Sequence, residues 1–139
     1  MDVAEIWQRI VAAFRAYEPG FSFDPGASEA QITACERALG VRFFADYRAS
    51  VALHDGSPGF YFIDQAEFLS LAHVVDLWRT NLEIARDLGP TIEGSPIEQW
   101  IHVVGPIRAQ YWGRRWIPIA RTGSAGTVFL DLEPLDTGA

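Results

Sequence analysis

Only a few side chains in the sequence combine the residue types and the spacing that chemistry requires. His54 and Asp55 are the first candidates, as metal ligands or as a general base. Two adjacent residues at the end of a helix point in different directions, however, and neither His73 nor His102 completes a ligand set with metal spacing. We therefore expect His54 and Asp55 to cap a helix.

A second candidate is the pair of carboxylates at Asp131 and Glu133, two residues apart on one face of a predicted strand. Paired carboxylates carry acid–base chemistry in glycosidases, but this pair lies at the end of a hairpin in an acidic protein. Residues 123–126 form a turn between two strands, whereas a phosphate loop joins a strand to a helix. No G-x-S-x-G nucleophile motif occurs. The sequence thus predicts no catalytic residue, no bound metal and no cofactor.

The charge balance indicates what kind of partner to expect. The formal net charge is −7, and all 11 basic residues are arginine. Without lysine, a Schiff-base mechanism and a Walker-type phosphate loop are both excluded. A negative chain is also a poor ligand for nucleic acid, whose binding depends on neutralising phosphates. A basic protein is the natural electrostatic partner, with solubility as the alternative reason for the acidity.

Hydropathy and cysteine content indicate the cellular compartment in which the protein is expected. No apolar run approaches the ~18 residues of a membrane span, and the N-terminus lacks the layout of a signal peptide. Cys35 is the only cysteine and lies on the apolar stripe of a predicted helix, where a buried small hydrophobe is expected. We expect a cytoplasmic protein that binds no membrane.

The elements that must position these residues follow from periodicity. Helical spacing and capping residues predict four helices. The first runs from Asp2 to before Pro19, the second from Ser28 to Gly40, the third from about Ala45 to His54, before Gly56, and the fourth from Ser70 to Gly89. Strands are predicted at 59–64, 68–69, 116–120 and 127–132, while 91–105 is left open. Pro118 places its strand at a sheet edge or at a bulge. Because helices come first and strands cluster late, the sequence predicts a single α+β domain over residues 1–139.

An aromatic and acidic constellation is the best candidate for a binding surface. Tyr61, Asp64 and Glu67 follow the turn after His54-Asp55-Gly56, and Trp112 precedes a strand together with Arg114 and Arg115. Trp, Tyr and Arg are the residues that most often anchor interfaces, although Trp112 is also a candidate for the core, where we place Phe62 and Trp116. The residues predicted to bind a partner are Asp55, Tyr61, Asp64, Glu67, Trp112, Arg114, Asp131 and Glu133.

Three stretches of the sequence resemble the SUKH superfamily, the group that includes the Smi/Knr-type regulator of yeast cell-wall synthesis. Residues 25–56 hold a Pro-Gly lead-in, a helix, "LGV", "DYR" and a closing "HDG". Residues 70–78 form a helix with a late Trp, and residues 105–134 hold "GPI", "WIPI" and "LDLEP". The resemblance implies a twisted, mixed or antiparallel sheet flanked by about four helices, with no shared catalytic constellation.

The resemblance also implies a function. Bacterial relatives are largely immunity proteins that neutralise a cognate toxin, and eukaryotic relatives are interaction modules. We therefore predict a non-catalytic immunity protein that binds a basic toxin, with a regulatory interaction module as the alternative; neither the toxin nor the oligomeric state follows from the sequence. The chain departs from the family pattern at Phe43-Phe44, where Leu-Pro is usual. Similar domains usually add a strand and a helix after "LDLEP", so we expect an uncovered sheet edge.

Overall fold

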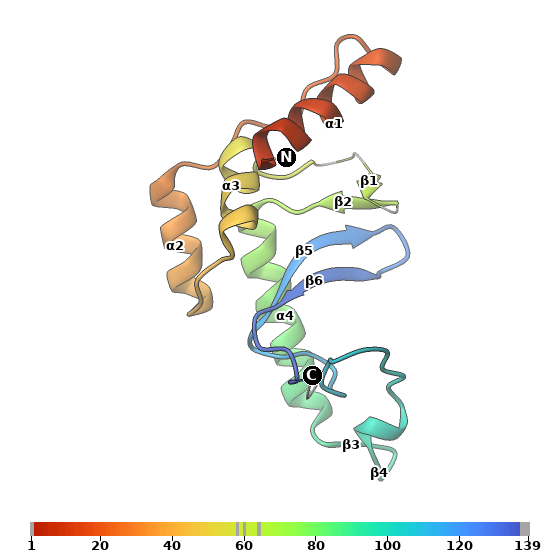
Figure 1. Cartoon of the computed structure of the whole chain (residues 1–139). Coiled ribbons are helices and arrows are strands. Elements are labelled where there is room, and N and C mark those ends of the chain that lie inside the picture. Colours follow the sequence, from red (N-terminus) through yellow and green to blue (C-terminus); the bar gives the residue numbers. More distant parts are fainter. Residues whose placement is uncertain (1, 58, 60, 64, 137–139) are drawn as a thin grey trace.

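Four helices and a small antiparallel sheet make up most of the computed structural model, which describes residues 2–57, 59, 61–63 and 65–136. The helices are α1 (Val3–Tyr17), α2 (Glu29–Leu39), α3 (Ala45–Leu53) and α4 (Leu71–Leu88). The strands are β1 (Tyr61–Ile63), β2 (Ala66–Phe68), β3 (Thr91–Ile92), β4 (Ser95–Pro96), β5 (Trp116–Thr122) and β6 (Thr127–Asp131), with a 3-10 helix, η1 (Ile97–Gln99), after β4. The predicted α+β class is confirmed (Figure 1).

The helices begin and end where the capping residues predict. The Asp2 carboxylate accepts a hydrogen bond from the Glu5 backbone N–H at 2.8 Å, and the Ser28 hydroxyl accepts one from Gln31 at 3.1 Å. Both form reciprocal capping boxes, which satisfy N–H groups that the first helical turn leaves without partners. Gly40 ends α2 in the left-handed region at φ +68°, a conformation that costs glycine little.

The larger sheet has the strand order β1-β2-β5-β6, and each neighbouring pair is antiparallel. Pro118 lies on β5, which is an inner strand, so the edge position suggested for it is wrong. The register of β5 against β6 shifts between Pro118 and Ala120, and the predicted bulge is confirmed. The segment left open by the sequence contains the short β3–β4 hairpin and η1, followed by irregular backbone.

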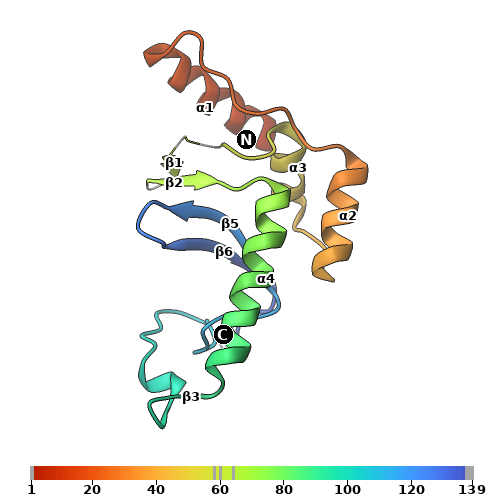
Figure 2. The same ribbon diagram turned by 180° about the vertical axis from the view of Figure 1, so that it is seen from behind.

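Helix α4 joins the helical layer to the sheet, since it contacts both α2 and β5 (Figure 2). The three tryptophans predicted to be buried, Trp7, Trp78 and Trp116, are only 6–7% exposed, so that prediction is confirmed. Trp7 packs edge-on against Phe23, with ring centroids 5.3 Å apart. Cys35 is also buried, and burial raises the pKa of its thiol to about 11, which leaves it protonated and unreactive at neutral pH.

Candidate protein-binding surface

Six of the eight predicted binding residues fall in two places. Tyr61 and Glu67 lie on the β1–β2 hairpin, whereas Trp112, Arg114, Asp131 and Glu133 lie where β5 begins and β6 ends. Asp64 lies outside the described residues. Asp55 belongs to the segment between α3 and β1.

On the hairpin, Tyr61 and Glu67 are directly paired across the two strands. The Tyr61 side chain is 55% exposed and is therefore free to contact a partner. The Glu67 carboxylate is 13% exposed and accepts hydrogen bonds from Arg121 at 2.8 Å and from the Gly59 N–H at 3.1 Å. The Arg121 guanidinium holds the pKa of Glu67 below its usual value, so Glu67 is charged at neutral pH. Much of that charge is already offset by Arg121.

Asp55 has a structural contact with α4. Its carboxylate accepts a hydrogen bond of 2.7 Å from the N–H of Leu71, the first residue of that helix. The Ser70 hydroxyl accepts a second one from His73 at 3.3 Å. His54 occupies the C-cap of α3, and its N–H donates to the Ser50 carbonyl oxygen. His54 thus occupies the predicted cap of α3, whereas the Asp55 carboxylate binds the start of α4 and not the helix that it follows.

At the other end of the sheet, Trp112 is part of an aromatic cluster. Its ring meets Trp116 edge-on at a centroid distance of 5.7 Å, and Trp116 stacks on Phe129 at 4.4 Å. Trp112 is half-buried, and its indole N–H is buried with no hydrogen-bond partner among the described residues. Most of this side chain packs inside the molecule, so its role as an anchor stays a prediction.

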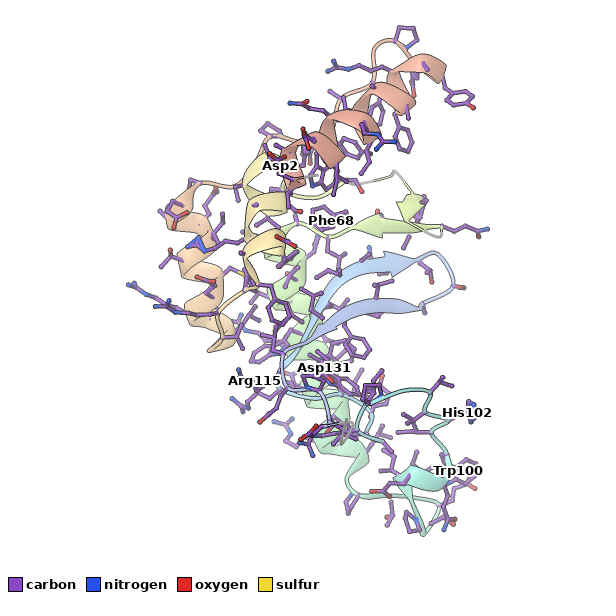
Figure 3. The ribbon with its side chains drawn as sticks, viewed as in Figure 1. Asp2, Phe68, Trp100, His102, Arg115 and Asp131 are labelled. Carbon is purple, nitrogen blue, oxygen red and sulfur yellow. The ribbon has the colours of Figure 1, made fainter. Side chains whose placement is uncertain are left out.

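Arg114, Asp131 and Glu133 line one cavity of about 150 Å³ together with Arg108 and Arg115. Figure 3 shows Arg115 close to Asp131, where β5 starts and β6 ends. One Asp131 oxygen accepts the Glu133 N–H at 2.9 Å, and the other is buried with no partner among the described residues. Glu133 lies 4.0 Å from the Arg115 guanidinium. The cavity thus concentrates arginine, with two carboxylates at its border.

The structure also reveals functional candidates that the sequence reasoning missed. A groove of about 850 Å³ runs between α2 and α3, and it is bordered by Arg37, Arg42, Arg48 and Arg115. The first three are distant in sequence from Arg115. The sequence contains little indication of this groove, because no pattern in it relates Arg115 to the connection between α2 and α3.

Within the described part of the chain, no group of three or more His, Cys, Asp or Glu side chains could hold a metal ion. No helix in that same part is long and apolar enough to cross a membrane.

These features define an α+β domain whose candidate site is a binding surface. The model of the SMI1/KNR4 family (SUKH-1) matches residues 26–139, and the chain belongs to this family. SUKH domains are protein-interaction domains, which agrees with that class. Helix α1 precedes the matched region. No curated protein matches the chain closely enough to add to this result.

Proposed function

We propose that this chain is a non-catalytic immunity protein that binds a basic toxin domain and covers its active surface. Membership of the SUKH-1 family supports a protein-binding role, and the net charge of −7 favours a basic partner. The observation that carries the proposal is the exposure of Tyr61 on the β1–β2 hairpin. A half-exposed tyrosine offers a large apolar area and a hydroxyl to the same partner.

The proposed mechanism separates steering from anchoring. The acidic surface raises the rate of encounter with a positively charged toxin, an effect that salt screens. Tyr61 then becomes buried in the interface and slows dissociation. Asp64 is proposed to add to the steering charge, whereas Asp55 and Glu67 already have partners within the fold.

A regulatory interaction module is the second candidate, because the family name covers Smi/Knr-type proteins. Both candidates bind a protein and differ in what that protein does. A partner that is a toxin supports the first candidate, and a component of a larger cellular assembly supports the second.

We expect Tyr61→Ala to raise the dissociation rate of the complex by about tenfold or more, since truncating an interface anchor costs roughly 1–2 kcal/mol or more. The matched control is Tyr17→Ala, because Tyr17 is 94% exposed at the end of α1. The partner would be captured from the source organism, identified by mass spectrometry, and its binding measured by surface plasmon resonance.

A salt series in the same experiment tests the steering. The association rate of the wild-type chain should fall as salt rises, and charge reversal at Asp64 should lower that rate at low salt. Equal dissociation rates for the two tyrosine variants, together with an association rate independent of salt, would contradict the proposed mechanism.

A further inference from the structure

Six of the 11 arginines line two neighbouring hollows on the surface of this acidic protein. The hollow of about 850 Å³ lies between α2 and α3, and the cavity of about 150 Å³ lies beside the start of β5. Arg115 borders both, so they form one surface, which we name the arginine groove. Its arginines are Arg37, Arg42, Arg48, Arg108, Arg114 and Arg115.

Most of these guanidinium groups have no partner among the residues that the structure describes. The exposed side chains of Arg37, Arg42, Arg108 and Arg114 form no ion pair or hydrogen bond with any described residue. Within the described part of the chain, the Arg115 side chain has one ion pair, the 4.0 Å approach to Glu133.

Arginines elsewhere are mostly occupied. Arg121 pairs with Glu67, Arg86 pairs with Asp87, and the Arg15 side chain donates to the Phe21 carbonyl oxygen. Arg79 on α4 is exposed and has no such contact within the described residues. Unpaired arginine is therefore concentrated at the groove, although the net charge of the whole chain is −7.

The carboxylates that line the groove are held by local structure. Glu36 accepts the Phe43 N–H at 2.8 Å and lies 3.6 Å from Arg48. Asp131 accepts the Glu133 N–H. Arg48 also pairs with Glu29 outside the groove at 2.6 Å. Glu29, Glu36, Asp131 and Glu133 therefore carry four negative charges against the six arginines, and the surface is positive.

We propose that the arginine groove binds an acidic segment of a partner protein, with Asp and Glu side chains of that segment paired to the arginines. Guanidinium groups match carboxylates with two parallel hydrogen bonds. Val41, Phe43 and Ala45 add apolar lining, which suits the aliphatic parts of a peptide. A nucleic acid fits less well, because the chain carries a net charge of −7 and Phe43 is too buried to stack on a base.

The arginine groove is separate from the surface proposed to bind a toxin. In Figures 1 and 2, α2 and the β1–β2 hairpin lie on opposite sides of the molecule. The groove can therefore be tested independently of the proposed function. With both surfaces, one domain would contact a basic and an acidic partner surface.

Binding of a fluorescein-labelled peptide of alternating Glu and Gly residues, followed by fluorescence anisotropy at about 0.15 M salt, tests this proposal. We expect the Glu peptide to bind and a peptide of alternating Gln and Gly residues to show no saturable binding. The double variant Arg37→Gln/Arg42→Gln should weaken binding about tenfold, since two exposed ion pairs are lost. Arg108→Gln/Arg114→Gln should weaken it similarly from the other end of the groove.

The matched control is Arg79→Gln/Arg86→Gln on α4, which removes the same two charges and should change the affinity less than twofold. Circular dichroism would verify that all three double variants fold. Equal weakening by the control and the groove variants would overturn the proposal, because it would show an effect of net charge alone. Tighter binding of a labelled single-stranded oligonucleotide than of the Glu peptide would also overturn it.

Discussion

Replacing Gly26 with alanine should lower the free energy of unfolding by at least about 3 kcal/mol, as expected for an atom forced into closely packed backbone. A Cβ atom at this position would overlap the carbonyl group of Ala52 at the end of α3. The neighbouring chain cannot easily move away, because the Ala27 N–H donates to the Val51 carbonyl oxygen at 2.8 Å. The Asp55 N–H likewise donates to the Pro25 carbonyl oxygen at 3.0 Å.

Urea denaturation of Gly26→Ala measures this effect. The matched control is Gly20→Ala, because a Cβ atom at Gly20 meets nothing within 4 Å. The control should unfold at close to the wild-type midpoint. A Gly26→Ala variant as stable as the control would show that the 25–27 segment does not lie against α3.

The second large effect is expected from the buried tryptophans. Truncation of Trp78 to alanine should cost about 3–5 kcal/mol, because it opens a cavity beneath α4. It also removes the 2.9 Å hydrogen bond from the indole N–H to the Arg114 carbonyl oxygen. We expect costs of the same size for Trp7→Ala and Trp116→Ala, since both side chains are equally buried.

Thermal and urea unfolding would be compared with Trp100→Ala, whose side chain is exposed. That control should change the free energy of unfolding by less than about 1 kcal/mol. Melting of the three core variants near the wild-type temperature would mean that these side chains are not packed as described.

Local signals explain what the sequence predicted correctly. Each capping box is formed by residues only three positions apart, and the Ser70 cap and the left-handed Gly40 are equally local. The ends of the helices could therefore be predicted from short stretches of sequence. The β5–β6 hairpin could also be predicted, because its strands flank a glycine-rich turn. The position of β5 inside the sheet could not be predicted, since its pairing with β2 joins segments about fifty residues apart.

The binding surface was harder to predict because its contacts are long-range. The sequence grouped Arg114, Asp131 and Glu133 without showing that they line one cavity. It did not reveal that Arg115 lines the same groove as Arg37 and Arg42, since no local pattern connects them. The roles of Asp55 and Glu67 within the fold were also hidden, because Leu71 and Arg121 are 16 and 54 residues away.

The two proposed binding surfaces on one small domain have a consequence for binding. The β1–β2 hairpin presents Tyr61 to a partner, while α2 and the start of β5 present the arginine groove. A toxin with an acidic segment beside a basic domain could occupy both, which would raise the affinity above that of either contact alone. Independent variants at Tyr61 and at Arg37/Arg42 separate these contributions.

Titration of the captured toxin's activity with the purified chain tests the central claim most directly. A non-catalytic inhibitor acts by occupancy, so activity should fall linearly and vanish at about one molar equivalent under tight-binding conditions. The toxin should regain full activity after the complex is separated in denaturant and the toxin is refolded. Unchanged activity at a large excess of the chain would contradict the account, and so would complete, irreversible loss at a small fraction of one equivalent.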